Sequence, residues 1–226
     1  MASNLELSNY YREVNFLNLY KVIAGLMFCF FKLNNKRVID IGCGSGMLDV
    51  ALAKMGPEVL AIDGGEKVEV FWNRMFSYPQ YGLKPQGLTL KKMSVEGVLL
   101  GIEANPYGLA LEKVVKDYFG EDQFNFGICM EVAQHIEKDL AEDSFPYLFH
   151  WLGVEYIWWS SAVPGQGKFV NCQPLSYWER LFGMFFEVDW ELTEKIKSRL
   201  LTNASKDILH FPCFRDNLMI FKKVKL

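Results

Sequence analysis

Apolar and polar positions along the chain follow two periods, one typical of strands and one typical of helices. Short apolar runs such as 37–41 and 59–62 lead into turns that contain glycine, and stretches with apolar residues three and four positions apart follow them. The pattern predicts strands over residues 37–41, 59–62, 88–93, 123–130, 154–160 and 218–221. It predicts helices over residues 47–54, 68–76, 107–119, 136–151, 177–185 and 192–201. Strands that alternate with helices predict an α/β fold with a doubly wound, mostly parallel sheet.

The residues before the first predicted strand are predicted to form one or two helices. Apolar residues from Leu5 to Leu19 have helical spacing, and no proline interrupts them. The apolar run 22–31 is too short to cross a bilayer as a helix, and it follows an acidic and polar start that is unlike a secretory signal. We therefore expect a helix that packs on the core or covers the site, with a membrane-surface anchor as the less favoured alternative.

Composition limits the class of protein. A chain of 226 residues, half of them apolar, is long enough for one sizeable globular domain and too short for two with a linker. We predict one domain over residues 1–226, with a helical extension over 1–34 and an α/β core over 35–226. A net charge of −3 argues against a nucleic-acid partner. The five cysteines show no CxxC spacing, which favours reduced thiols and a cytoplasmic protein. The sequence does not show an oligomeric state.

A glycine-rich turn, Gly-Cys-Gly-Ser-Gly at residues 42–46, follows the first predicted strand. In open parallel sheets ligands bind at the carboxyl ends of the strands, and glycines let the backbone approach them closely. Asp63 closes the second predicted strand, where a carboxylate can accept both hydroxyls of a ribose. The GxGxG spacing and the lack of a following GK[ST] disfavour a pyrophosphate or triphosphate ligand. Together the two features indicate a nucleoside-containing ligand, although alone each could be a turn without a ligand.

The chain resembles a known superfamily in two blocks. Residues 38–46 (Val-Ile-Asp-Ile-Gly-Cys-Gly-Ser-Gly) resemble the first motif of class I S-adenosylmethionine-dependent methyltransferases, and residues 126–136 resemble its fourth-strand motif. With Asp63 between them, the likeness covers residues 37–161. It implies a Rossmann-like, seven-stranded sheet with extra N-terminal helices, S-adenosylmethionine as the cofactor and S-adenosylhomocysteine as the product.

The resemblance also implies roles for single residues. Asp40 and Gly42 would hold the methionine end of the cofactor, Asp63 would hold the ribose, and Ser94 would lie beside the adenine. The full set of cofactor-binding residues implied in this way is Asp40, Gly42, Cys43, Gly44, Asp63, Gly64, Ser94, Val95 and Met130.

A further block, over residues 164–182, resembles a bacterial and phage-type subset of these enzymes, with a PGQG…VNxQPxxYW pattern. In that subset the stretch follows the fifth strand on the substrate side. Phe169 stands where those relatives often have a histidine, so no base is predicted there. The substrate-side residues implied are Glu131, Gln166, Asn171, Gln173, Tyr177 and Trp178.

Methyl transfer from a sulfonium needs no covalent nucleophile, because the sulfonium carries its own leaving group. A hydroxyl acceptor would benefit from a general base, and His135 is the histidine nearest the predicted site. A helix-capping role for His135 is the alternative. Some ubiquinone-type O-methyltransferases hold a divalent metal over residues equivalent to 131–135. Gln134 stands where a second carboxylate would be needed, so we predict no metal.

The sequence therefore predicts a methyltransferase that O-methylates a small molecule or a glycan, with no nucleic-acid partner and no membrane span. Methylation of protein or RNA remains an alternative within the same chemistry. A cofactor-binding subunit without turnover is a second alternative. An NAD-dependent Rossmann oxidoreductase is a third, which the GxGxG spacing disfavours.

Overall fold

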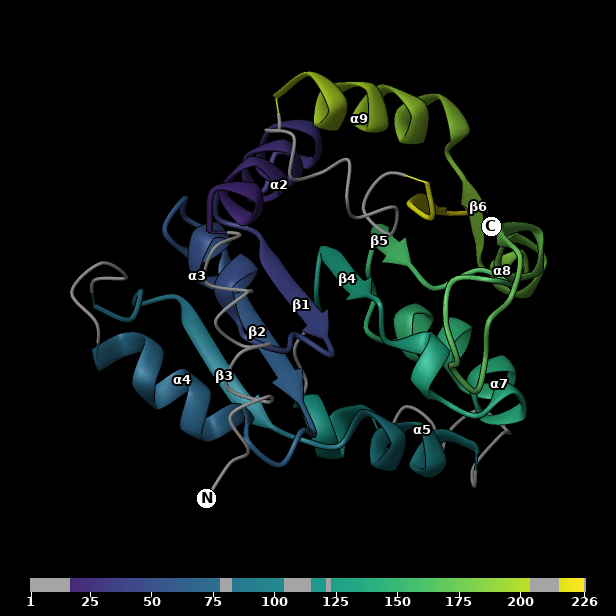
Figure 1. Ribbon diagram of the computed structural model, residues 1–226, viewed down its shortest axis with the longest axis horizontal. Helices are drawn as coiled ribbons and strands as arrows, with labels where there is room; N and C mark the ends of the chain where they lie inside the picture. The colour runs from purple at the N-terminus through teal and green to yellow at the C-terminus, as the bar shows by residue number, and fades with distance from the viewer. Residues whose placement is uncertain (1–16, 78–82, 104–114, 121–122, 204–215, 226) are drawn as a thin grey trace.

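The computed structural model describes residues 17–77, 83–103, 115–120, 123–203 and 216–225 (Figure 1). Its centre is one seven-stranded sheet with the strand order β3-β2-β1-β4-β5-β7-β6. All strands run parallel except β7, which is antiparallel to both of its neighbours. The strands are β1 (Arg37–Ile41), β2 (Glu58–Asp63), β3 (Leu88–Lys92), β4 (Phe126–Met130), β5 (Tyr156–Ser160), β6 (Phe186–Val188) and β7 (Met219–Lys223). The predicted α/β fold with a mostly parallel, doubly wound sheet of seven strands is confirmed.

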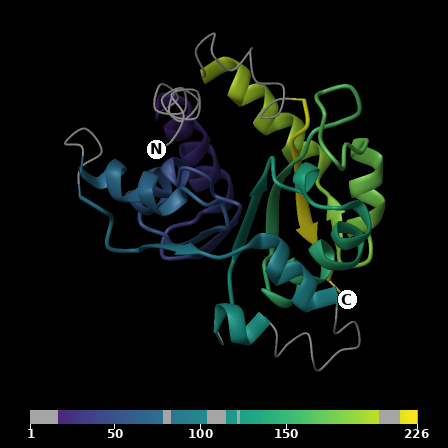
Figure 2. The same cartoon turned by 60° about the horizontal axis from the view of Figure 1, so that its bottom comes forward.

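Helices cover both faces of this sheet. On one face α2 contacts both α3 and α9, and on the other α5 and α8 contact α7. Figure 2 shows α2 in purple and α9 in yellow-green on the same side of the sheet. The helices are α2 (Leu17–Phe31), α3 (Met47–Ala53), α4 (Val68–Ser77), α5 (Val95–Glu103), α7 (Lys138–Trp151), α8 (Leu175–Phe182) and α9 (Trp190–Asn203), with a short 3₁₀ helix η2 (Ala133–His135).

The alternation of side chains along each strand divides the core into two halves. On β1, Ile39 and Ile41 pack with the α5, α7 and α8 layer, while Val38 packs with the α2, α3 and α9 layer. Since side chains alternate between the faces of a strand, Asp40 points to the same side as Val38, toward α3. This placement brings one buried carboxyl of β1 beneath the helix that follows the glycine turn.

Several predicted elements differ from the observed ones. No helix was predicted directly after Ser94, yet the chain forms α5 there, and the Gly97 N–H donates to Ser94 Oγ at 3.1 Å as in a capped helix start. The three-residue edge strand β6 was not predicted, and the helix predicted over 177–185 begins and ends earlier, as α8. The helix predicted over 107–119 and the helical segment before residue 17 lie largely outside the described residues. None of the described helices combines the length and the apolar character needed to cross a membrane.

Candidate functional site

The strand order of the sheet reverses between β1 and β4. From β1 the chain proceeds outward to β2 and β3, and then returns to β4 and continues to β5 on the other side. Loops that leave two neighbouring parallel strands toward opposite faces leave a crevice at the carboxyl edge, which is where ligands bind in such sheets. The glycine turn after β1 and the residues after β4 border this crevice.

Three glycines shape the turn after β1. Gly42, Gly44 and Gly46 have φ angles of 81°, 52° and 71°, a left-handed conformation that L side chains rarely adopt. A Cβ on Gly42 would collide with the side chain of Val132, which follows β4. A Cβ on Gly44 would instead have no protein atom within 4 Å, so it would enter open space. Gly42 is thus required by protein packing, and Gly44 leaves room for something that is not protein.

Asp63 fixes the turn from the end of β2. Its Oδ2 accepts the Gly44 N–H at 2.8 Å and its Oδ1 accepts the Gly65 N–H at 2.7 Å. On the other side of the turn, Trp72 Nε1 of α4 donates to the Gly44 carbonyl at 3.0 Å. Gly44 is therefore held through both of its backbone polar groups. Each carboxylate oxygen of Asp63 can still accept a second hydrogen bond, as a ribose diol would require.

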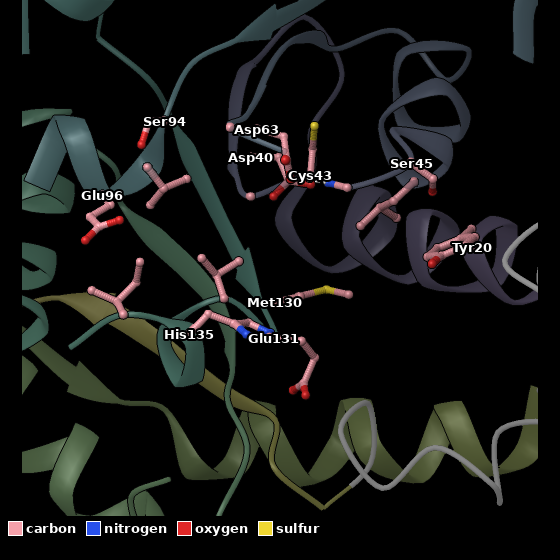
Figure 3. A pocket seen from close by; sticks show the side chains of 17 residues that line it. Tyr20, Asp40, Cys43, Ser45, Asp63, Ser94, Glu96, Met130, Glu131 and His135 are labelled. Atoms are coloured by element: carbon pink, nitrogen blue, oxygen red, sulfur yellow. Dashed lines mark hydrogen bonds between the residues drawn. The ribbon is translucent and has the colours of Figure 1, made fainter. Parts of the chain in front are cut away.

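These elements surround a cavity of about 640 Å³ (Figure 3). It carries four carboxyl side chains, those of Asp40, Asp63, Glu96 and Glu131, and none of the described residues that line it is Lys or Arg. Such a lining favours a ligand with positive charge and disfavours a pyrophosphate. The lining residues are Tyr20, Asp40, Gly42, Cys43, Gly44, Ser45, Leu48, Asp63, Gly64, Ser94, Val95, Glu96, Met130, Glu131, Val132, His135 and Ile136.

Glu131 occupies an unusual backbone position directly after β4. Its φ is 59°, in the left-handed region that non-glycine residues adopt only at a cost of about 1–3 kcal/mol. The side chain accepts hydrogen bonds from Ser160 Oγ at 2.9 Å and from Gln134 Nε2 at 3.1 Å. Burial raises the pKa of Glu131, and these two hydrogen bonds partly oppose that rise. The carboxyl group is thus oriented toward the cavity, and its protonated form is favoured more than in an exposed glutamate.

His135 closes the same side of the cavity, at the end of η2. Its ring is exposed and lies edge-on to the Phe169 ring with 5.0 Å between the centroids. Figure 3 shows His135, Glu131 and Met130 together on the β4 side, opposite Asp40, Cys43 and Asp63. An exposed imidazole beside the cavity can exchange protons with solvent, as a general base must.

The residues predicted to bind the cofactor come together in this cavity. Its lining includes Asp40, Gly42, Cys43, Gly44, Asp63, Gly64, Ser94, Val95 and Met130, together with Glu131 and His135. That they contact a cofactor or a substrate remains a prediction. Sequence reasoning missed six further residues of the lining, namely Tyr20, Ser45, Leu48, Glu96, Val132 and Ile136. The Ser-Val-Glu capping pattern could have indicated Glu96, whereas Tyr20 reaches the cavity only through the packing of α2.

The other predicted substrate-side residues lie outside the lining of this cavity. Asn171 is buried, and its Nδ2 donates to the Ala133 carbonyl at 3.3 Å, so it supports η2 from behind. Trp178 is fully buried in the core, and Gln166 forms a hydrogen-bonded pair with Asn217. Gln173 and Tyr177 border a separate, smaller depression together with Lys138 and Arg180. Their role as substrate contacts remains a prediction.

Within the described part of the chain, no group of three or more His, Cys, Asp and Glu side chains is arranged to hold a metal ion. Gln134, where a second carboxylate would stand, uses its amide for the protein itself. Its Nε2 donates to Glu131, and its Oε1 accepts from Ser161 Oγ at 3.1 Å and from the Ala162 N–H at 3.2 Å. The amide therefore orients Glu131.

No protein family model matches the chain. Its sequence is similar to ubiquinone biosynthesis O-methyltransferases, with 27% identity over 104 residues to that of Bordetella avium and 29% over 104 residues to that of Stutzerimonas stutzeri. These matches cover 46% of this chain and about a third of the relatives, 34% and 35% respectively.

Among solved structures, the chain is similar to the magnesium protoporphyrin IX methyltransferase of Synechocystis with bound S-adenosylmethionine. The TM-score is 0.56 at 16% identity, over 94% of this chain and 81% of the other. A TehB-like S-adenosylmethionine-dependent methyltransferase of Corynebacterium glutamicum also gives a TM-score of 0.56, at 14% identity, over 96% of this chain and 97% of the other. The fold is therefore that of class I methyltransferases.

Proposed function

We propose that this chain is an S-adenosylmethionine-dependent methyltransferase that acts on a small molecule. The observation that carries the proposal is the cavity at the crossover between β1 and β4, which combines a glycine cradle, a carboxylate at the end of β2 and an anionic lining. S-Adenosylmethionine is a nucleoside that carries a sulfonium and an ammonium group, so its ribose and its positive charge both suit this lining. The curated relatives with similar sequence are methyltransferases as well.

Different residues of the cavity suit different parts of the cofactor. Asp40 and the open space at Gly44 suit the methionine end. Burial raises the pKa of Asp40, and a bound ammonium group would favour its ionised form, while the missing Cβ of Gly44 allows close approach. Asp63 suits the ribose hydroxyls. Ser94 and Val95, at the start of α5, suit the adenine, and Met130 lies on the β4 side where the sulfonium would face the acceptor. The bound cofactor supplies a methyl group that is already activated for substitution.

The acceptor would enter on the β4 side, where Glu131 and His135 line the cavity. We infer that it carries a hydroxyl group, as a small molecule or a glycan does, and that His135 takes the proton from that hydroxyl. The exposed ring supports this role because it can pass the proton on to solvent. The buried Glu131 carboxyl would hold a polar group of the same acceptor. Methyl transfer to protein or RNA is the competing outcome, and the anionic lining argues against RNA.

Calorimetric titration of the purified chain with S-adenosylhomocysteine, with NAD⁺ as the comparison, tests the cofactor. We expect binding of the first ligand alone. Affinity for NAD⁺ without affinity for S-adenosylhomocysteine would refute the proposal in favour of an oxidoreductase. Transfer of a labelled methyl group from S-adenosylmethionine into fractionated cell extract then tests the acceptor class, and we expect the label in the small-molecule fraction. Label confined to protein or RNA would contradict that choice.

The role of His135 has its own test. We expect His135→Gln to lower the rate of methyl transfer at least about tenfold, as loss of a general base does. The affinity for S-adenosylhomocysteine should remain unchanged. His150→Gln is the matched control, because His150 lies on α7 outside the cavity lining, stacked on Phe185. A rate that is lowered equally in both variants would contradict the assignment.

A further inference from the structure

The imidazole of His135 lies beside the cavity without a hydrogen-bonding partner. The backbone N–H of His135 donates to the Val132 carbonyl at 2.9 Å, but within the described part of the chain no group bonds either ring nitrogen. A histidine that acts as a base is ordinarily oriented by a third group, such as the carboxylate of a catalytic triad. If His135 is a base, its orientation has to come from another kind of contact.

The ring of Phe169 makes that contact. The centroids of the two rings are 5.0 Å apart and their planes meet at 80°. This is an edge-to-face arrangement, within the range of about 4.5–7 Å that aromatic pairs prefer. Phe169 is 38% exposed and belongs to neither half of the core. Its ring therefore packs on the imidazole at the surface, and substituting it does not open a cavity in the core.

The loop that carries Phe169 is shaped to hold the ring in this place. Gly167 has a φ of 146°, and a Cβ on it would lie 2.7 Å from Cε2 of the Phe169 ring. Any side chain at this position would push the ring away from where it lies. The absence of a side chain on Gly167 is thus what allows the Phe169 ring to lie against His135.

The same loop is tied to η2, the short helix that ends in His135. Two residues after Phe169, the Asn171 N–H donates to the Gln134 carbonyl at 3.2 Å, and Asn171 Nδ2 donates to the Ala133 carbonyl at 3.3 Å. Asn171 is buried, so these bonds are protected from water. The two rings are therefore carried by segments that are fixed to each other.

We propose that Phe169 is a positioning residue for His135, whose ring holds the imidazole toward the cavity in place of a hydrogen-bonding partner. The inference rests on the proposed function, because the imidazole is the group that takes the proton from the acceptor. Three wells for χ1 and two for χ2 give a free histidine side chain about six orientations. If one of them is productive, loss of the Phe169 ring lowers the rate of methyl transfer by up to about sixfold.

Substitutions of Phe169 in the full chain test the proposal through the rate of methyl transfer from labelled S-adenosylmethionine into cell extract. Phe169→Leu keeps the apolar bulk and removes the ring, so we expect a rate about three- to sixfold lower, with unchanged affinity for S-adenosylhomocysteine. Phe169→Tyr keeps the ring and should restore most of the rate. A rate in Phe169→Leu equal to that of the wild type would overturn the proposal.

A double variant separates positioning of His135 from a direct contact between Phe169 and the acceptor. Without the imidazole there is nothing for the Phe169 ring to position. His135→Gln combined with Phe169→Leu should therefore be no slower than His135→Gln alone. If Phe169→Leu slows the His135→Gln variant by the same factor as the wild type, Phe169 acts on something other than His135 and the proposal fails.

Two glycines of the loop provide a matched pair of variants. Gly167→Ala pushes the Phe169 ring away without altering it, whereas Gly165→Ala, at a φ of 90°, places a methyl group where no protein atom lies within 4 Å. We expect Gly167→Ala to lower the rate about as much as Phe169→Leu does, and Gly165→Ala to leave it near that of the wild type. Equal losses in the two glycine variants would contradict the proposal.

A spectroscopic readout does not depend on turnover. The chain has three histidines, so the ring C–H signal of His135 in a ¹H–¹³C NMR spectrum is identified by its loss in His135→Gln. We expect Phe169→Leu to abolish the ring-current shift of this signal and to lower its order parameter, and Gly165→Ala to change neither. An unchanged His135 signal in Phe169→Leu would overturn the proposal. If the wild type transfers no methyl group, the proposed function fails, and the spectra still decide whether Phe169 fixes the imidazole.

Discussion

Substitution of Gly44 by alanine tests whether the open space at the glycine turn is a ligand cradle. The φ of Gly44 is 52°, and no protein atom lies within 4 Å of the place that a Cβ would occupy. The backbone cannot easily move the new methyl group aside, because the Gly44 N–H is bonded to Asp63 and the Gly44 carbonyl to Trp72. The methyl group would therefore stay in the space beside the cavity, where it excludes a ligand rather than disturbs the protein.

The cost to the free protein is small. An alanine in the left-handed region is strained by about 1–2 kcal/mol. Alanine also lowers the conformational entropy of the unfolded chain, which offsets about 0.4–1 kcal/mol of that strain. The net loss is about 1 kcal/mol, which corresponds to a fall in melting temperature of about 2–4 °C for a chain of this size. For the ligand, one methyl group in a closely fitted cradle should cost at least about 1.4 kcal/mol, a tenfold loss of affinity.

Gly120→Ala is the matched control. Gly120 has a φ of 79° and equally open surroundings, but it does not line the cavity. The melting temperature should therefore fall by a similar amount in both variants, while calorimetry with S-adenosylhomocysteine should show weaker binding in Gly44→Ala alone. Unchanged affinity in Gly44→Ala, or an equal loss in Gly120→Ala, would refute the reasoning.

Three further substitutions probe the supports of the site. Asp63→Asn replaces one accepting oxygen by an amide and removes the charge. Calorimetry should therefore show S-adenosylhomocysteine binding about 10- to 100-fold more weakly, the equivalent of one charge-assisted hydrogen bond. An unchanged affinity would contradict a role of Asp63 in ligand binding. Trp72→Phe removes the donor to the Gly44 carbonyl and should lower the free energy of unfolding in urea by about 1 kcal/mol. Ser160→Ala removes a hydrogen bond that lowers the pKa of Glu131, so that pKa should rise further. The proposed role requires an ionised Glu131 to hold a polar acceptor. On acidification, the variant should therefore lose activity at a higher pH than the wild type does. A pH–activity profile with the same acidic midpoint in both proteins would contradict that role.

The side of the cavity around the glycine turn could be predicted from the sequence because its signals are local. A β-branched run, a glycine turn and an aspartate at the end of the next strand are each readable in a few residues. The geometry of parallel sheets then brings the ends of β1, β2 and β4 to one edge. For that reason all nine residues predicted to bind the cofactor line one cavity.

The parts that escaped prediction depend on contacts between distant segments. Trp72 holds the turn from 28 positions away. Spacing could not show that the Asn171 amide turns toward the Ala133 carbonyl and not into the cavity. The edge strand β6 has only three residues, too few for an alternating pattern to stand out.

The described lining of the cavity comes from one part of the chain, and this limits how the rest of the chain can influence it. It is drawn from residues between Tyr20 and Ile136, and none of the described residues beyond Ile136 contributes to it. The later helices and strands instead build the other half of the sheet and support η2 from behind. A substitution in that half can therefore affect the cavity only indirectly, through contacts such as those of Ser160 with Glu131 and of Asn171 with the Ala133 carbonyl.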